Sequence, residues 1–399
     1  MAHAFIPYGI YWSTPFARWQ GGLSHLHSLE LAAWVAKREL ARRNVAATAF
    51  DHAILGTTVP QKHGFYGVPW VTGMLGAPGV TGPTVNQACA TSARCLQMAA
   101  TAITTGEAEA SLVITADRCS NGPHLYYPDP RGAGGTGAHE DWVLDNFSFD
   151  PYARGAMIDT AENVARKWGI TLEEQHQVTL QRYAQYDRAL ADDRAFLRRF
   201  MPLPFEVPDA RFKKTTATLA GDEGIFETTA EGLARLKPVK EGGSVTFGSQ
   251  THPADGGAAL AVTTRERAAE LSRDRKIEVR LLGFGQARVE PAFMPAATIP
   301  AARKALLAAD LSIGQIDAIK SHNPFAVNDI VFARELGVDV GRINDYGSSL
   351  VWGHPQGPTG LRTIIELIEM LVLRGGGRGL FYGCAAGDSA MATVLSVTA

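Results

Sequence analysis

Two segments of this chain, about 266 residues apart, share one pattern of residue types. The first is AKRELARRNVAATAFDHAI, from Ala36, and the second is ARKALLAADLSIGQIDAI, from Ala302. In each, apolar residues at helical spacing lead through a polar break to an apolar residue and an aspartate, which open a short apolar run. The pattern predicts a helix and then a strand at both places. Such a repeat favours a fold with two similar halves.

The similarity continues further along each half. Helical spacing in SARCLQMAATAI, from Ser92, and in TGLRTIIELIEML, from Thr359, predicts amphipathic helices, and the runs at 111–116 and 379–385 predict strands after them. One more strand is expected in each half, starting at Asp255 and at Gly387. Sequence identity between the halves is weak, but the order of the elements agrees.

Alternation of helices and strands in both halves favours an α/β fold whose sheets are covered by helices. A single Rossmann-like domain with additions is the alternative. No GxGxxG or GxxxxGK[ST] motif follows a predicted strand, so neither kind of phosphate-binding loop is expected.

The first half is interrupted by an insertion. Its last strand follows Pro253, whereas the strand before it ends near Cys119, and the second half has no such gap. We therefore predict a first half made of residues 1–119 and 253–268, an inserted domain at 120–252, and a second half at 269–399.

Local patterns inside the insertion predict a loop and two helices. The stretch GPHLYYPDPRGAGGTG has neither helical nor strand periodicity, so we expect a loop there. Helices are expected at 158–168 and 171–191. The second opens at Thr171 with Glu174 three residues later, which is the pattern of a capping box.

Charge and cysteine content exclude several classes of function. With 38 Lys and Arg against 40 Asp and Glu, the formal net charge of -2 gives no global attraction to nucleic acid or to an anionic membrane. The start of the chain, MAHAFIPYGIYW, lacks the features of a signal peptide, and no run reaches the roughly 18 apolar residues of a membrane span, so we expect a cytoplasmic protein. Four cysteines without metal-ligand spacing predict free thiols, with neither a disulfide framework nor a metal site.

Cys89 lies between a short β-type run and the start of a long predicted helix. Unpaired backbone N–H groups and the positive end of the helix dipole favour a thiolate there, and the thiolate is the nucleophilic form of cysteine. His354, in GHPQGPTG after a β-rich stretch at 348–352, is flanked by prolines and glycines that suit a fixed general base. A buried small hydrophobe at 89 and a structural turn histidine at 354 are the alternatives.

Cys384 and His322 each follow a predicted strand of the second half. Small residues after Cys384 leave backbone N–H groups free to stabilise an oxyanion, and its thiol could move a proton. His322 falls at the carboxyl end of its strand, the edge at which open α/β sheets bind ligands. The duplication would bring both residues to places similar to those of Cys89 and His354, although either could also be a buried structural residue.

Four sequence blocks resemble the signature blocks of thiolases, in this order and across nearly the whole chain. They are VNQACATSARCLQMAATAI, LKPVKEGGSVTFGSQTHPADGGAALAV, INDYGSSLVWGHPQGPTGLR and FYGCAAGDSAM. The resemblance implies the thiolase fold, in which two βαβαβαββ halves form a five-layered α/β core with an inserted loop domain that helps to hold coenzyme A. It also implies a homodimer or tetramer.

By motif position, the resemblance implies that Cys89 takes the acyl group and that His354 is the base that activates it. Cys384 would move the proton on and off the α-carbon of the second acyl-CoA. One oxyanion hole would consist of the backbone N–H groups of Cys89 and Ala386, and the other of His354 with a group at His322. Coenzyme A and acyl-CoA would be substrates, with no permanently bound cofactor and no metal.

The chain departs from the thiolase pattern around the expected acyl and pantetheine pocket. The sequence His322-Asn323-Pro324-Phe325 replaces the common Asn-Glu-Ala-Phe, and its first residue resembles the sterol-carrier-type branch. Ala156-Met157 stands where acetoacetyl thiolases commonly have His-Met, and Thr251-His252 replaces Ser-Gly. Residues expected to contact substrate or coenzyme A are therefore Thr251, His252, Met157 and Phe325. Aromatic residues that could also line the pocket are Phe65, Tyr66, Trp70, Tyr126, Tyr127 and Trp352.

The sequence thus predicts an acyltransferase that cleaves a 3-oxoacyl-CoA with coenzyme A, or runs the reverse Claisen condensation, through an acyl-Cys89 intermediate. The altered pocket favours a substrate other than acetoacetyl-CoA, with branched or aromatic compounds such as benzoylsuccinyl-CoA as candidates. A condensing enzyme of the ketoacyl-synthase type is the alternative, and Cys384 argues against it because such synthases do not need that second thiol. A thiolase subunit that needs a small OB-fold and zinc-ribbon partner for activity is a further hypothesis.

Overall fold

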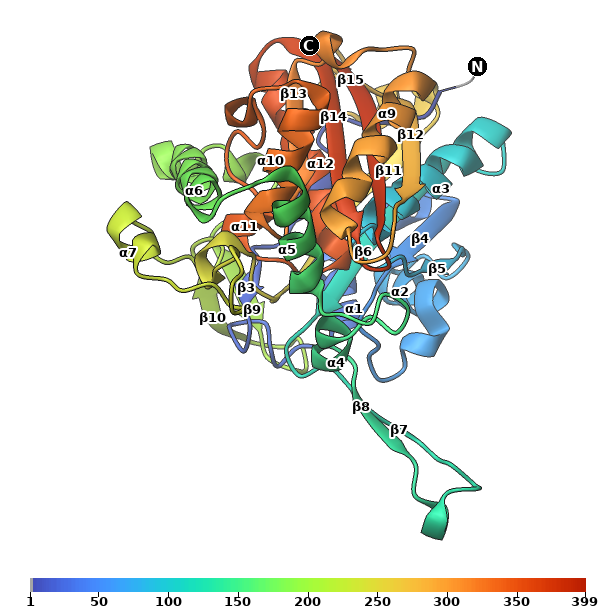
Figure 1. Cartoon of the computed structure of the whole chain (residues 1–399). Coiled ribbons are helices and arrows are strands. Elements are labelled where there is room, and N and C mark those ends of the chain that lie inside the picture. The colour runs from blue at the N-terminus through green and yellow to red at the C-terminus, as the bar shows by residue number, and fades with distance from the viewer. Residues whose placement is uncertain (1–2) are drawn as a thin grey trace.

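The computed structural model describes residues 3–399 (Figure 1). The strands among these residues are β1 Phe5–Ile6, β2 Tyr11–Ser13, β3 Ala17–Arg18, β4 His52–Gly56, β5 Thr84–Val85, β6 Ala110–Arg118, β7 His124–Tyr127, β8 Ala138–Asp141, β9 Phe205–Pro208, β10 Thr215–Leu219, β11 Ala254–Thr263, β12 Glu278–Arg288, β13 Ala318–His322, β14 Gly376–Ala385 and β15 Ser389–Thr398. The α-helices are α1 Ser28–Arg42, α2 Gly67–Leu75, α3 Thr91–Thr105, α4 Leu144–Ser148, α5 Met157–Trp168, α6 Leu172–Arg194, α7 Ala230–Ala234, α8 Arg265–Leu271, α9 Thr298–Ala308, α10 Ala326–Leu336, α11 Ser349–Trp352 and α12 Gly357–Leu373.

One large mixed sheet repeats the same strand order in its two halves. Within residues 3–399 it contains eleven strands, in the order β13-β14-β15-β12-β1-β11-β6-β4-β5, with β2 and β3 added to β11. On one side β4 is parallel to β6, which is antiparallel to β11; on the other, β13 is parallel to β14, which is antiparallel to β15. The short strand β1 joins the halves because it pairs with both β11 and β12.

Helices cover both faces of each half of the sheet. In the middle layer α3 and α12 contact each other, with α3 against β4 and β6, and α12 against β13 and β14. The outer layers are formed by α1 and α2 over the first half and by α9, with α10 beside it, over the second (Figure 1). These five layers confirm the predicted α/β fold class.

The middle-layer helix α12 is buried from Gly357 to Leu371 on every side, as expected for a helix that is apolar around most of its circumference. No helix in residues 3–399 combines the length and the apolar character that crossing a bilayer requires. α12 packs against strands of both halves of the sheet, and its apolar side chains fill this interior position.

α3 and α12 approach each other closely near their N-terminal ends. The Ser92 hydroxyl of α3 donates a hydrogen bond to the backbone carbonyl of Gly357, the first residue of α12. A Cβ atom at Gly360 would lie only 3.0 Å from Ser92 Cβ and 3.2 Å from the ring of Phe381, so glycine is what allows this approach. The contact sets the spacing of the segments that immediately precede the two helices.

Residues 119–253 leave the sheet between β6 and β11, which pair with each other directly along their length. We propose that residues 120–252 form an inserted domain.

Both helices predicted within this segment are present, as α5 and α6. The backbone of α6 departs from helical geometry at Ala191. The predicted capping box is also present, because Glu174 N–H donates to Thr171 Oγ1 at 3.2 Å and Thr171 N–H donates to Glu174 Oε2 at 2.9 Å.

Two local predictions are wrong. The stretch expected to be a loop contains β7, which pairs with β8 directly after the stretch in an antiparallel hairpin that extends away from the body of the molecule (Figure 1). Both faces of the hairpin are largely exposed, so no alternation of apolar and polar residues marks its strands. The stretch at 348–352, expected to be β-rich, contains the short helix α11, whose residues are all buried and so show no helical period.

A buried group of charged side chains connects the insertion to the middle layer. Arg362 of α12 donates to Asp222 from both terminal nitrogens, at 2.6 and 2.8 Å, and the side chains of both residues are fully buried. Asp222 also accepts from the backbone N–H of Phe16 and from the hydroxyl of Tyr186, both at 2.8 Å. Because an unpaired charge is costly to bury, removing one partner of this pair should strongly destabilise the fold.

We predict that Asp222→Ala lowers the free energy of unfolding by about 3–5 kcal/mol, because it removes the main counter-charge of a buried guanidinium. Chemical denaturation followed by tryptophan fluorescence measures this change. The matched control is Glu206→Ala, which breaks an ion pair with Arg38 whose side chains are both more than half exposed, and should cost about 1 kcal/mol or less. Equal losses in the two variants would contradict the prediction.

Candidate functional site

Cys89 is held in a rigid turn between β5 and α3. The turn is fixed by Thr91, whose hydroxyl accepts from Gln87 N–H at 2.8 Å and lies 2.7 Å from the carbonyl of Ala88. Ala88 has a φ of 45°, a left-handed conformation that costs energy in a residue other than glycine. Backbone strain of this kind is common at functional sites, and here it is next to the partly buried Cys89.

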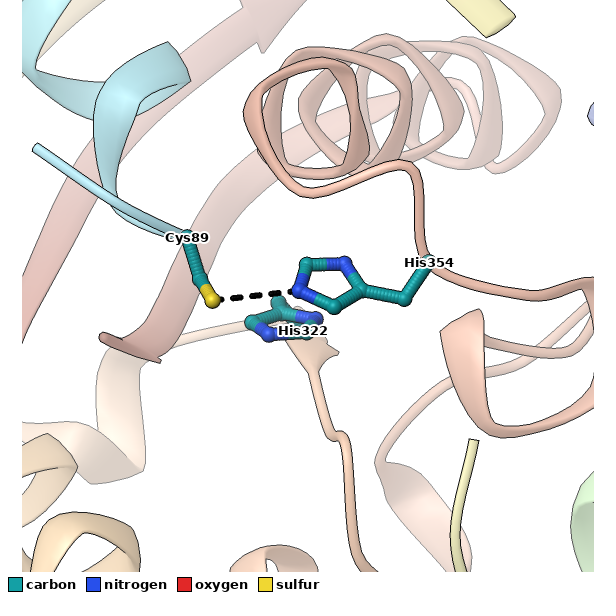
Figure 2. Close-up of side chains that lie close together, drawn as sticks. All are labelled: Cys89, His322 and His354. Atoms are coloured by element: carbon teal, nitrogen blue, oxygen red, sulfur yellow. Dashed lines mark hydrogen bonds between the residues drawn. The ribbon is translucent and has the colours of Figure 1, made fainter. Parts of the chain in front are cut away.

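His354 lies against Cys89, in the turn between α11 and α12. Its Nε2 atom is 3.1 Å from Cys89 Sγ, and its Nδ1 atom is 2.6 Å from the hydroxyl of Thr359 (Figure 2). Its backbone N–H donates to the carbonyl of His252 at 2.9 Å. The ring is therefore fixed from both sides, with one nitrogen toward the sulfur. A nucleophile and a base at this distance form the arrangement required for nucleophilic catalysis.

Burial determines the protonation of this pair. Burial raises the pKa of the Cys89 thiol to about 12, against the smaller opposing effect of hydrogen bonds from the backbone N–H groups of Ala386 and Cys89 itself. Burial also lowers the pKa of His354 well below its ordinary value, and the neighbouring His322 lowers it further. The expectation of a thiolate stabilised by the helix start is therefore wrong, because desolvation outweighs the backbone dipoles. At neutral pH the pair consists of a thiol and a neutral imidazole, which can accept the thiol proton.

His322 stacks on His354 at the end of β13 (Figure 2). The ring centroids are 4.0 Å apart and the rings are inclined by 26°. His322 Nδ1 is 3.1 Å from the hydroxyl of Ser349, whereas its Nε2 atom is buried without a hydrogen-bond partner. Burial lowers the pKa of His322 to about 3, so this imidazole is neutral as well. Its unpartnered nitrogen is available to a ligand.

Cys384 is fully buried at the end of β14, where Asn328 of α10 donates from its side-chain amide to the sulfur at 3.2 Å. Burial raises the pKa of the Cys384 thiol above its ordinary range, and the proximity of Cys89 adds to this effect. The group is therefore protonated, and it can donate a proton to a carbanion that forms beside it.

The buried carboxylate of Asp329 supports the end of β13. Its two oxygens accept from five side chains: Arg182 at 2.9 Å, Ser321 at 2.7 Å, Asn323 at 2.7 Å, Asn344 at 3.0 Å and Tyr382 at 3.0 Å. Ser321 and Asn323 flank His322 in the chain, so this carboxylate fixes the backbone that carries the histidine. The ion pair with Arg182 links the same place to helix α6 of the insertion.

A cavity of about 980 Å³ opens in front of the sulfur. Cys89, His354 and Ala386 line it, together with three residues predicted to contact substrate, namely Thr251, Met157 and Phe325. His252 is buried behind this wall and is not among the lining residues, and neither are His322 and Cys384. The sequence-predicted residues thus form a lining group and a group directly behind it.

The aromatic residues expected in the pocket are elsewhere. Phe65 is 96% exposed, Tyr126 and Tyr127 lie on the projecting hairpin, and Trp352 is fully buried against Phe16. Tyr66 and Trp70, near Phe65, do not line the cavity either. Six other aromatic residues line it instead: Trp142, Phe147, Phe149, Tyr152, Phe247 and Phe325. The five besides Phe325 were missed because they lie in loops and very short helices of the insertion, where periodicity gives no signal.

Sequence reasoning also missed the polar side chains that orient the reacting groups. Thr359 and Ser349 hold the Nδ1 atoms of the two histidines, and Asn328 holds the sulfur of Cys384. Thr359 and Ser349 lie within five residues of His354 in the chain, so hydroxyls near a candidate base were the available signal. Asn328 lies in the first turn of the helix after His322, and no local pattern connects it to residue 384.

Two family models match the chain. The one described as thiolase, N-terminal domain, matches residues 12–266, and the one described as thiolase, C-terminal domain, matches residues 275–397. An acetyl-CoA acetyltransferase of Pseudomonas aeruginosa is 30% identical over 387 residues, which cover 96% of this chain and 97% of the relative. A beta-ketoadipyl-CoA thiolase of Acinetobacter baylyi is 30% identical over 408 residues, with 99% of each chain covered.

Solved structures of thiolases also match this chain. The crystal structure of human mitochondrial 3-ketoacyl-CoA thiolase superimposes with a TM-score of 0.90 at 26% identity, covering 100% of this chain and 99% of the other. The same human enzyme is known in complex with CoA, and that structure also matches with a TM-score of 0.90. Family models that span both halves, full-length relatives and a shared fold together show that this chain is an acyltransferase that belongs to the thiolase family.

Proposed function

We propose that this protein cleaves a 3-oxoacyl-CoA with coenzyme A through an acyl-Cys89 intermediate, and that its substrate is bulkier than acetoacetyl-CoA. The observation that carries the reaction is the 3.1 Å distance between Cys89 Sγ and His354 Nε2 at the wall of a large cavity. A base at hydrogen-bonding distance from a protonated thiol can deprotonate it as the sulfur attacks.

In the first half-reaction, His354 Nε2 takes the thiol proton and Cys89 Sγ attacks the 3-oxo carbon. The backbone N–H groups of Cys89 and Ala386 are proposed donors to the oxyanion. The bond between C2 and C3 then breaks and its electron pair stays on C2, so an enolate of the shorter acyl-CoA forms. Cys384 protonates C2, and the protonated His354 and the unpartnered nitrogen of His322 face the enolate oxygen.

In the second half-reaction, coenzyme A enters after the shorter acyl-CoA has left. The Cys384 thiolate takes the proton of the coenzyme A thiol, whose sulfur attacks the acyl group on Cys89. The acyl–sulfur bond to Cys89 breaks, and the released sulfur recovers its proton from His354. Every group returns to its starting state, and the alternation of the two products gives ping-pong kinetics.

The cavity supports a bulky substrate. Aromatic side chains line it, and the small Ala156 stands at its wall where acetoacetyl thiolases commonly have histidine. Relatives of this chain include a beta-ketoadipyl-CoA thiolase, whose name indicates an acyl group longer than acetoacetyl. A branched or aromatic 3-oxoacyl-CoA such as benzoylsuccinyl-CoA is therefore our first candidate, with cleavage as the proposed direction.

A condensing enzyme of the ketoacyl-synthase type is not favoured, because Cys384 and its amide partner Asn328 have a use only if a proton is moved at an α-carbon. Two features of the assembly remain proposals on the strength of the thiolase resemblance: a homodimer or tetramer, and a small OB-fold and zinc-ribbon partner. Activity of the isolated chain would make that partner unnecessary.

We predict that Cys384→Ala separates the two kinds of chemistry. Thiolysis should fall by about 10²–10⁴-fold, because no group remains to protonate the carbanion. Exchange of labelled coenzyme A into an acyl-CoA should fall much less, because it forms no carbanion and solvent can replace Cys384 in moving the proton of the coenzyme A thiol. The matched control is Cys95→Ala, a core thiol of α3 outside the site, which should retain both activities. Equal losses of thiolysis and exchange in a folded Cys384→Ala protein would contradict the proposed role at the α-carbon.

The protonation of Cys89 predicts how its alkylation depends on pH. Since burial raises the pKa of the thiol to about 12, the thiolate fraction should increase about tenfold for each pH unit between pH 6 and pH 9. The rate of alkylation by iodoacetamide, measured by peptide mapping at residue 89, should increase in parallel. A rate that is constant over this range would instead indicate a preformed thiolate–imidazolium pair.

Substrate size can be tested at Ala156. We predict that the Ala156→His variant loses kcat/KM for the bulky substrate by about tenfold or more, relative to acetoacetyl-CoA, because the larger side chain fills the acyl end of the cavity. A panel of 3-oxoacyl-CoAs assayed with coenzyme A gives the ratio. Phe65→Ala, at an exposed position outside the cavity, serves as the control. An unchanged ratio would show that residue 156 does not contact the acyl group.

A further inference from the structure

We propose that Cys89, His322 and His354 form a reversible binding site for Zn²⁺, and that the bound ion holds the enzyme inactive and shields its nucleophile. The three residues come from three separate places: the turn before α3, the end of β13, and the turn before α12 (Figure 2). One ligand atom from each lies within 4.8 Å of the others. This inference goes beyond the thiolase reaction and does not depend on its substrate.

The chemistry of the donors selects the ion. Cysteine sulfur and imidazole nitrogen are both ligand types that Zn²⁺ binds in proteins, at about 2.3 Å and about 2.0 Å respectively, in tetrahedral geometry. With Cys89 Sγ already 3.1 Å from His354 Nε2, these two ligand atoms can share one ion with little movement. Mg²⁺ and Ca²⁺ prefer oxygen ligands and are not expected to bind.

His322 supplies the independent observation that points to a ligand. Its Nε2 atom is fully buried and has no hydrogen-bond partner, which is unusual for a nitrogen in a protein interior. Its Nδ1 atom is held by Ser349, as that of His354 is held by Thr359. Metal-binding histidines typically use their second nitrogen in this way, because the hydrogen bond fixes the ring and its tautomer.

The cavity provides both access and the fourth coordination position. Cys89 and His354 line it, so an ion can reach them from solvent, and a water molecule in the cavity can complete the tetrahedron. On binding, Cys89 Sγ loses its proton to solvent and each imidazole contributes a lone pair, so no oxidant or reductant is needed. Because the ion occupies the nucleophile and the base together, its binding and that of acyl-CoA exclude each other.

The direct test uses Co²⁺ as a spectroscopic substitute for Zn²⁺ on the full-length protein treated with a chelator. We expect a saturable sulfur-to-cobalt charge-transfer band with the visible bands of tetrahedral cobalt, removed by Zn²⁺ and absent in Cys89→Ala. His322→Asn, which loses one ligand, should weaken binding by at least about 100-fold, the upper end of what the loss of a supporting partner costs. The control is the double variant His124→Asn, His139→Asn, which removes the adjacent histidines of the projecting hairpin and should bind normally.

A second measurement keeps the proposal testable even if His322→Asn does not fold. In the unmodified protein, saturating Zn²⁺ should slow alkylation of Cys89 by iodoacetamide at least tenfold, and a chelator should restore the rate. A cobalt band that persists in Cys89→Ala, unchanged affinity in a folded His322→Asn protein, or alkylation unaffected by Zn²⁺ would each overturn the proposal. None of these measurements needs turnover, so the zinc site and the proposed thiolysis can fail separately.

Discussion

The site depends on the fully buried ion pair between Asp329 and Arg182. A buried carboxylate is tolerated only when it is neutralised and fully hydrogen-bonded, and Asp329 meets this condition with five side-chain donors. Those donors come from the insertion, from β13 and β14, and from the segment before α11. One carboxylate therefore holds the insertion, the sheet edge and the backbone on both sides of His322 in a single arrangement.

The four reacting side chains are uncharged because they too are buried. Both histidines are neutral and both thiols are protonated in the resting protein, so the site holds no net charge among these four groups. Charge appears only when a substrate enters and a proton moves from sulfur to nitrogen. In a desolvated site, fixed dipoles such as the Ala386 N–H then act with little screening by water. Reactivity is thus linked to substrate binding.

The fold could be predicted to a large extent from the sequence, because the duplication preserves the order of helices and strands even where identity is weak. Buried strands, α5, α6 and the capping box at Thr171 follow from periodicity and local hydrogen bonding. The exposed hairpin β7–β8 and the buried helix α11 could not be predicted, since a segment exposed on both faces, or buried on all sides, has no period to detect.

For the site, the motifs identified the side chains at 89, 322, 354 and 384, but their roles in catalysis stay predictions. Their protonation could not be inferred from a helix start alone, because the pKa of Cys89 depends on burial by segments distant in the chain. Partners such as Asn328 could not be found from a local pattern either.

The close contact of α3 with α12 at Ser92 and Gly360 also positions the reacting groups. Cys89 lies in the turn before α3 and His354 in the turn before α12, so the distance between them depends on how the two helices pack. Sliding one of these two helices past the other by about an ångström would change the path of the proton by a similar amount, so packing in the centre of the molecule is under the same constraint as catalysis itself.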